Sequence, residues 1–353
     1  FTSSQALLFG NNAGVDQVTL SGGAAVVSTA AVNQPITFTA RVDGGQSLTV
    51  NSGTGTTTFN GAVGGTTALA SLTTDAGGTT NLNGGSVTTT GAQTYNDAVV
   101  VGANVTLTTT SGPVLFSQDV SGAFSLTITG GTGNVTFSST IGAGANPDPT
   151  GVVITTSGNI TFTGAVNTGG GITLSGADVS INSGIYSSAA GNLQVTNSGI
   201  FTILDTTSAL DDTSADLNIL GSFTQISGGG GSAVSIQGDI VTSAGNSITF
   251  NSPLTLTGNV LLQANGAGNI TVNSTVNATT ASVEGLRFYT DTGNINVTGP
   301  VGGGQRLGAL SITSAADASF TNGVTATSFT QSAGSGTTTF NGTQDYTGNF
   351  SFT

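Results

Sequence analysis

The chain has 353 residues and a formal net charge of −13, and only 5% of its residues are charged, against about 25% in ordinary soluble proteins. It contains no Lys, His, Cys, Met or Trp, and its only basic residues are Arg41, Arg287 and Arg306. This composition argues against nucleic acid as a partner and against docking on anionic membrane surfaces, because both need clustered Lys and Arg.

The composition also bears on the compartment. No apolar stretch approaches the roughly 20 residues of a membrane-spanning helix, so no membrane insertion is expected. The chain starts at Phe1 without an initiator Met, and we interpret it as a processed mature chain or a segment of a larger protein. The lack of Cys and Met removes the oxidisable sulfur groups, which suits long exposure outside a cell. We therefore expect an extracellular or cell-surface location.

From the N-terminus onward the chain repeats one short phrase: Gly, then Asn or Thr, then alternating apolar and Thr positions. The alternation, bounded by Gly, Asn and Ser, predicts short β-strands with one face turned inward. Such strands are expected, in chain order, at 55–61, 78–84, 98–101, 126–128, 133–137, 158–162, 172–174, 179–181, 245–250, 254–256, 268–272, 293–297 and 336–342. No stretch has the apolar spacing of an amphipathic helix.

The spacing between equivalent positions predicts how the strands are arranged. Phe59 and Leu82 hold equivalent positions in successive phrases, as do Phe137 and Phe162. The separation is roughly 22–25 residues, a period that is typical of solenoids. We predict an all-β fold, a right-handed parallel β-solenoid (β-helix) of degenerate coils, with the Gly and Asn of each phrase at corners where positive φ is tolerated. Tandem β-sandwich domains are the alternative.

The same pattern sets the expected domain organisation. Residues 1–353 are predicted to form a single continuous β-solenoid, with loop excursions near 143–151 and 205–216. The first excursion contains the turn-like run Asn146-Pro147-Asp148-Pro149, and the second interrupts the repeat with acidic residues.

The Gly-Asn-Ile/Val-Thr-Phe phrases at 133–137 and 158–162, and the Gly-Thr-Thr-Thr-Phe-Asn-Gly run that occurs at 55–61 and again at 336–342, carry a resemblance to a known family. They resemble the passenger β-helices of bacterial surface proteins, of the filamentous-haemagglutinin and autotransporter type. The resemblance implies an adhesin-like function, in which cell-surface or matrix glycans are candidate partners. The secretion domain and translocator barrel of those families are not recognisable in this sequence.

Catalytic chemistry has few residues to draw on. Without His, Cys or Lys, nucleophilic triads and histidine-based acid–base catalysis are excluded, and zinc loses its preferred ligands. A pair of carboxylates on a β-helix, as in carbohydrate-active enzymes, is the one remaining route. We expect a protein that is not an enzyme and has no catalytic or cofactor-binding residues, and we keep the carbohydrate-active enzyme as the least favoured alternative.

The densest acidic segment is the one candidate metal site. Its residues are Asp205, Asp211, Asp212 and Asp216. Hard carboxylate oxygens in a loop are the ligands that calcium prefers, so calcium is the only cofactor considered. The spacing matches neither an EF-hand nor a calcium-binding β-roll, and a solvated loop that keeps the surface soluble is the competing interpretation.

Nine Asn-x-Ser/Thr sequons are present, which makes a glycosylated surface one interpretation. The alternative is that the repeat phrase produces sequons automatically and that its Asn side chains hydrogen-bond in a ladder. The candidate glycosylation sites are Asn104, Asn134, Asn159, Asn269 and Asn296.

The ends of the chain show no obvious cap. The C-terminal stretch carries Phe340, Tyr346, Phe350 and Phe352, with Asp345 as its only charge. An uncapped β-edge pairs readily with another chain, so these four residues are the predicted assembly edge. We expect the protein to bind itself head to tail, as the protomer of a fibre, sheath or surface layer. A stalk segment within a large cell-surface adhesin is the alternative.

Overall fold

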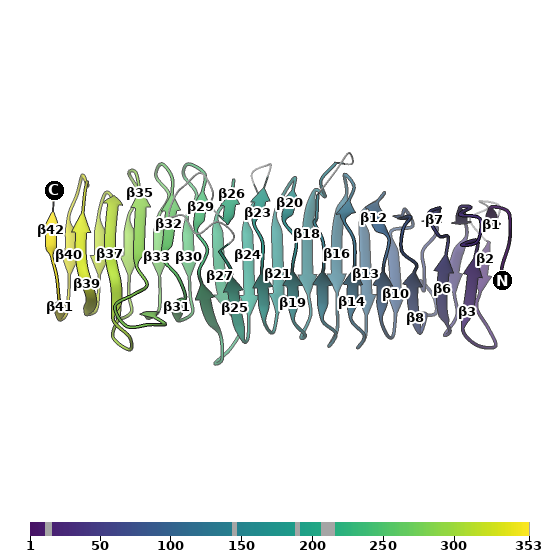
Figure 1. Ribbon diagram of the computed structural model, residues 1–353, viewed down its shortest axis with the longest axis horizontal. Coiled ribbons are helices and arrows are strands. Elements are labelled where there is room, and N and C mark those ends of the chain that lie inside the picture. The colour runs from purple at the N-terminus through teal and green to yellow at the C-terminus, as the bar shows by residue number, and fades with distance from the viewer. Residues whose placement is uncertain (11–15, 143–146, 188–190, 206–215, 353) are drawn as a thin grey trace. The chain divides into compact units, whose positions relative to one another are not determined.

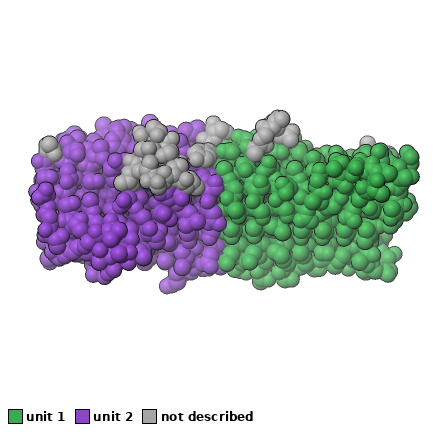
Figure 2. Space-filling model, in the orientation of Figure 1, with its two compact units in different colours: residues 1–170, 174–176 green, residues 171–173, 177–353 purple. Residues whose placement is uncertain are grey.

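All regular structure in the described part of the chain is β-strand (Figure 1). The computed structural model describes residues 1–10, 16–142, 147–187, 191–205 and 216–352. The chain divides into two compact units, residues 1–170 with 174–176 and residues 171–173 with 177–353 (Figure 2). The strand β21 (Ile172–Gly176) contributes residues to both.

The first unit contains three ladders of hydrogen-bonded strands and one short pair, β2 (Gln17–Thr19) with β5 (Arg41–Asp43). One ladder consists of β1 (Leu7–Phe9), β4 (Ile36–Phe38), β7 (Thr56–Phe59), β9 (Thr79–Leu82), β12 (Ala98–Val101) and β15 (Val120–Ser121). Another consists of β3 (Ala25–Ser28), β6 (Ser47–Asn51), β8 (Ser71–Thr74), β11 (Gln93–Tyr95), β14 (Val114–Phe116), β17 (Val135–Phe137) and β19 (Ile160–Phe162). The third consists of β10 (Ser86–Thr89), β13 (Val105–Thr109), β16 (Ser125–Thr129) and β18 (Gly151–Thr155), and β20 (Val166–Thr168) follows along the chain.

The second unit repeats the arrangement with three ladders. One consists of β22 (Val179–Ile181), β25 (Ile200–Ile203), β28 (Ala233–Ile236), β31 (Leu254–Leu256) and β34 (Val276–Ala278). Another consists of β24 (Leu193–Asn197), β27 (Phe223–Ser227), β30 (Ile248–Phe250), β33 (Ile270–Val272), β36 (Ile295–Val297), β38 (Ala318–Phe320) and β40 (Thr338–Phe340). The third consists of β23 (Ile185–Ser187), β26 (Leu217–Ile219), β29 (Ile240–Thr242), β32 (Val260–Ala264), β35 (Leu286–Thr290), β37 (Leu307–Ser314), β39 (Val324–Gln331) and β41 (Gln344–Tyr346), with β42 (Phe350–Phe352) also paired to β39.

The strands pair in parallel and in a register that places like residues on like. Ile248 of β30 pairs with Ile270 of β33, and Ile270 in turn pairs with Ile295 of β36, so each partner lies one winding further along the chain. Parallel neighbours one winding apart are the signature of a solenoid, whereas β-sandwiches are built from antiparallel strands. The predicted right-handed parallel β-solenoid is therefore confirmed, and the tandem sandwiches are wrong.

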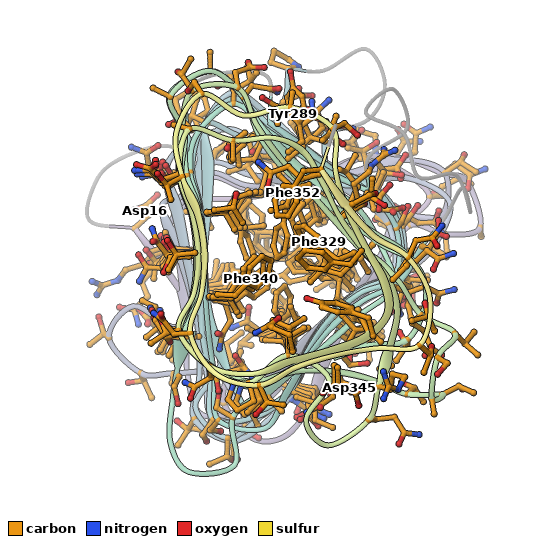
Figure 3. All side chains as sticks on the ribbon, turned by 90° about the vertical axis from the view of Figure 1, so that its left-hand side faces the viewer. Asp16, Tyr289, Phe329, Phe340, Asp345 and Phe352 are labelled. Atoms are coloured by element: carbon orange, nitrogen blue, oxygen red, sulfur yellow. The ribbon has the colours of Figure 1, made fainter. Side chains whose placement is uncertain are left out.

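The core of each unit is a set of apolar columns inside the windings. Most strands alternate buried and partly exposed residues, so one face of each lines the lumen. The largest fully buried side chains are aromatic: Tyr95, Phe38, Phe59, Phe116, Phe137, Phe162, Phe201, Phe223, Phe250, Phe288, Phe320 and Phe329. Figure 3 shows Phe329 and Phe340 pointing into this interior, and Tyr289 at the outer side of the wall. In-register pairing turns one inward Phe per winding into a column of rings.

The corner glycines differ from the sequence prediction. Of the phrases beginning at Gly133, Gly158, Gly268 and Gly293, none has its Gly at positive φ. These positions have no space for a side chain: a Cβ on Gly293 would lie 1.9 Å from the carbonyl oxygen of Gly268. The glycine is therefore required because the backbones of successive windings approach closely at this turn, and the expected positive φ is wrong there.

The Asn of the phrase connects one winding to the next. The side-chain oxygen of Asn134 accepts a hydrogen bond from the backbone N–H of Asn159 (2.9 Å), and Asn269 accepts one from Asn294 (2.8 Å). Asn294 in turn accepts from the N–H of Asp317 (3.1 Å). The predicted Asn ladder is thus a side-chain-to-backbone ladder that satisfies N–H groups at the turn.

The predicted domain organisation is only partly addressed. Both units have the same winding pattern, but a single continuous solenoid over 1–353 stays a prediction. Of the expected loop excursions, residues 143–146 and 206–215 lie outside the described residues.

Candidate functional site

The last winding of the second unit presents strand edges. In the described residues β40 pairs only with β38, while β41 and β42 pair only with β39. Each of the three therefore has a second edge whose backbone N–H and C=O groups face away from the preceding winding. The C-terminal edge is defined here as β40, β41 and β42.

The four aromatic residues predicted from the sequence form one cluster at this edge. Phe340 stacks on Phe320 of the preceding winding, with ring centroids 5.1 Å apart. Phe350 lies 5.0 Å from Tyr346 and 5.3 Å from Phe352, measured between ring centroids. Phe350 and Phe352 are 47% and 54% exposed, whereas Phe329, the register partner of Phe350, is fully buried. The C-terminal edge therefore carries exposed aromatic surface in this structure.

An ion pair fastens this last winding to the wall. Arg306 donates to the carbonyl oxygens of Ala326 and Asp345, at 2.9 Å each, and also pairs with the Asp345 carboxylate. The Tyr346 hydroxyl donates to Gln344 (2.9 Å), and burial raises the pKa of Tyr346 to about 12. Asp345 is the one charged residue of the C-terminal edge. Because its carboxylate is paired with Arg306, it opposes pairing with another strand less than an unpaired charge would.

The first winding of the first unit is a matching edge that sequence reasoning did not name. Phe1 and Leu8 are 72% and 67% exposed, and Val26 of β3 is 48% exposed. Phe9 stacks on Phe38 at 4.8 Å and begins the column that continues into the unit. The N-terminal edge is defined here as β1, β2 and β3. The signal in the sequence was the pair Phe9 and Phe38, about one winding apart.

The acidic segment is placed only in part. Asp211 and Asp212 lie outside the described residues. Asp216 is 2% exposed, and its carboxylate accepts a hydrogen bond from the N–H of Asp239 (3.0 Å). No group of three or more acidic residues in the described ranges is arranged to hold a metal ion. Calcium binding at Asp205, Asp211, Asp212 and Asp216 stays a prediction.

Asp239 is the residue that sequence reasoning missed in this region. It is 4% exposed, and its carboxylate accepts a hydrogen bond from the N–H of Leu261 (2.6 Å). Burial raises the pKa of Asp239 to about 7, with the nearby charges of Asp216 and Asp205 adding to the effect and Arg287 opposing it. The position of Asp239 one winding after Asp216 was the signal that places the two carboxylates together.

The candidate glycosylation sites occupy two kinds of position. Asn104, Asn134 and Asn269 lie at turns, where their side-chain oxygens accept N–H groups of the next winding, and Asn159 lies at the equivalent turn. Asn296 instead lies at the centre of β36 with its side chain exposed. Glycosylation of these residues stays a prediction, while the turn positions have a structural role that explains the repeated Asn.

No family model, no curated protein and no solved structure matches this chain. The resemblance to the filamentous-haemagglutinin and autotransporter passengers therefore stays a resemblance. In the part of the chain that the structure describes, no helix is long and apolar enough to cross a membrane.

Proposed function

We propose that the protein is a non-enzymatic structural protein of the cell surface or extracellular matrix, whose copies join head to tail in a fibre, sheath or surface layer. The observation that carries this proposal is the C-terminal edge, where strand edges and the exposed rings of Phe350 and Phe352 lie together. Backbone pairing supplies the affinity at such an edge, and burial of the rings supplies further stabilisation.

The direction of the windings favours contact between unlike ends. A parallel solenoid has polarity, so only the N-terminal edge of a second copy continues the three ladders in parallel register. The N-terminal edge offers Phe9, which begins a ring column in the first unit, and the C-terminal edge offers Phe350, stacked on Phe329. A contact between unlike ends does not close on itself and therefore generates a filament.

The carboxylates support the non-enzymatic part of the proposal. Asp43, Asp75 and Asp119 each accept backbone N–H groups at the turns, between 2.6 and 3.1 Å. Asp216 and Asp239 lie close together, but they are 2% and 4% exposed, which leaves no surface for a substrate. A carbohydrate-active enzyme needs two carboxylates on either side of a scissile bond. These five carboxylates accept backbone N–H groups instead.

A stalk segment of a larger adhesin is the second candidate. The same edges would then continue into further windings of one polypeptide, and the stacking of the exposed Phe350 on Phe329 is the observation that favours it. The two candidates differ in whether separate copies of residues 1–353 associate.

Sedimentation velocity and negative-stain electron microscopy of purified residues 1–353 across a concentration series test the proposal. We expect filaments whose length grows with concentration. Phe352→Asp places a charge at the C-terminal edge and is expected to yield dispersed monomers. Ile200→Asp is the matched control, because Ile200 is 49% exposed on the wall and not at an end. Dispersed monomers of the unaltered protein, or filaments of Phe352→Asp, would overturn the proposal, and the former outcome favours the stalk.

A further inference from the structure

The outer wall of the second unit has a hollow at β32, β35 and β37. Strand alternation places Leu261 and Gln263 of β32 on the outer face, in register with Arg287 and Tyr289 of β35. Outer residues elsewhere in the ladders are usually half-buried or exposed, yet Leu261 is 1% and Gln263 is 7% exposed. The wall therefore changes from covered at β32 to open at β37, and a cavity of about 230 Å³ lies at this step.

A β-bulge shapes the mouth of the hollow. Phe288 pairs with Ile312 of β37, but Tyr289 pairs with Ser314, so one extra residue, Thr313, stands in the bulged strand. Thr313 is exposed and lines the cavity. Bulges redirect side chains and are frequent beside functional sites.

Arg287 lines this hollow and also a second one. The second cavity, of about 310 Å³, is lined by Arg287 together with Asn259 and Ser311, which precede Leu261 and Thr313 of the first cavity along the chain. The first cavity has room for roughly seven waters at their liquid volume. Both cavities are lined by the planar guanidinium of Arg287. Two adjoining cavities of similar volume suit a ligand made of linked units, with one unit in each cavity.

The polar groups of the hollow indicate the chemistry of that ligand. The Gln263 amide donates to Asn265 (2.8 Å), and its oxygen accepts no hydrogen bond from the described residues. Tyr289 donates to the Asp291 carboxylate, so its hydroxyl is oriented and its ring forms a fixed part of the lining. Guanidinium, amide and hydroxyl groups offer both donors and acceptors, and the ring offers an apolar face.

Local charge disfavours ions of either sign. An anion would meet Arg287, but also the Asp291 carboxylate, which is hydrogen-bonded to Tyr289 on the same wall. It would also meet Asp216 and Asp205, which like Arg287 lie close enough to act on Asp239. A cation would meet the guanidinium on the cavity wall itself. An uncharged ligand with many hydroxyl groups faces neither cost.

We propose that the hollow lined by Leu261, Gln263, Arg287, Tyr289 and Thr313 binds a neutral saccharide unit, with the adjoining hollow that Arg287 also lines taking the next unit of the chain. This site is independent of the two terminal edges. Through this site the protein would bind a neutral polysaccharide at the outer face of β32, β35 and β37, whether or not its copies assemble.

Tyrosine fluorescence and saturation-transfer NMR test the site, because the chain has no Trp and only four Tyr. The probes are cellohexaose, laminarihexaose and mannohexaose as neutral arms, and hexagalacturonate as the acidic arm. We expect at least one neutral oligosaccharide to bind with a Kd on the order of 1 mM, as is usual for small uncharged ligands in open sites. Thr313→Arg, which fills the mouth of the hollow, is expected to weaken binding about tenfold or more.

Gln194→Arg is the matched control, since Gln194 is exposed at an outward position of β24 and lines neither hollow. It is expected to bind as the unaltered protein does. Absence of binding by all three neutral probes, unchanged binding by Thr313→Arg, or tighter binding of hexagalacturonate than of any neutral probe would overturn the proposal. The titration is repeated with Phe352→Asp, the variant that is expected not to assemble. Unchanged saccharide binding by this variant shows that the hollow acts independently of assembly at the C-terminal edge.

Discussion

The aromatic columns of the two units differ in regularity. In the first unit Tyr95, Phe116, Phe137 and Phe162 stack with centroids 4.6–5.2 Å apart and rings within 11° of parallel. In the second unit the rings of Phe223 and Phe250 are tilted by 56°, although the register partners Phe320 and Phe340 stack within 6° of parallel. The register explains the contrast, because Phe116 pairs with Phe137, whereas Phe223 pairs with Ile248 and Phe250 with Gln225. A ring stacks on the one before it where the two residues are register partners.

The same contrast extends to the outer walls. Most strands of the first unit alternate buried and partly exposed residues, with β5 and β15 among the exceptions. In the second unit β29 and β32 are buried at every position, and the β-bulge lies between β35 and β37. Irregular windings therefore coincide with the hollow that we propose as a binding site.

The largest expected loss of stability comes from removing a ring of the regular aromatic column. Phe137→Ala leaves a cavity between two stacked rings and is expected to lower the free energy of unfolding by about 4–5 kcal/mol, measured by urea denaturation with circular dichroism. Phe223→Ala is expected to cost less, about 3 kcal/mol, because tilted neighbours can partly fill the space. Thr136→Ala, on the outer face of the same strand as Phe137, is the control and should cost at most about 0.5 kcal/mol. Equal losses for the two Phe variants would show that regular stacking adds nothing.

A smaller loss of stability is expected from Gly→Ala substitutions at turns where backbones of successive windings approach closely. Gly293→Ala is expected to cost about 1–3 kcal/mol, because its Cβ would lie 1.9 Å from a backbone oxygen that cannot move away freely. Gly158→Ala, where the nearest backbone atom is 2.6 Å away, should cost less. Gly230→Ala is the control, with nothing within 4 Å of its added Cβ. The same denaturation measurement applies, and a Gly293→Ala variant as stable as Gly230→Ala would contradict the close-packing argument.

The smallest expected effect is the pH dependence of the free energy of unfolding. Burial raises the pKa of Asp97 in the first unit to about 6 and that of Asp239 in the second to about 7. Between the unfolded value of about 4 and these values the folded protein holds protons that the unfolded chain has released. The contribution of each group is therefore complete below about pH 4 and is lost as the pH rises through about 6 or about 7.

Thermal melts across this range measure the effect. The midpoint of unfolding is expected to fall with rising pH. Asp97→Asn keeps an oxygen for the N–H of Gly78 (2.8 Å) and should flatten the curve up to about pH 6. Asp239→Asn should flatten it up to about pH 7. Asp119→Asn is the control, because Asp119 is a half-buried turn acid that accepts the N–H of Thr140 (3.1 Å). A midpoint that rises with pH in the unaltered protein would contradict the assignment.

Much of the fold was predictable because each winding is a local pattern. The runs at 133–137 and 158–162 alternate apolar and Thr residues, and the structure has strands β17 and β19 there in parallel register. The four aromatic residues that the sequence singled out, with Asp345 as the only charge among them, lie beside one another at β40, β41 and β42, and their part in assembly stays a prediction. Asp239 was not identified from the sequence, because a lone Asp in a turn has no local signature and acquires its neighbours only from the windings before and after it.

The sequence by itself determined the period of the windings, the inward face of the strands and the apolar character of the C-terminal edge, because all three follow from residue order within about 25 positions. Only the tertiary structure decided why the phrase needs its glycine, which backbone groups the Asn oxygens serve, and where the outer wall is hollow. These features depend on how one winding lies on the next, and the contacts between windings join residues whose exact offset varies along the chain.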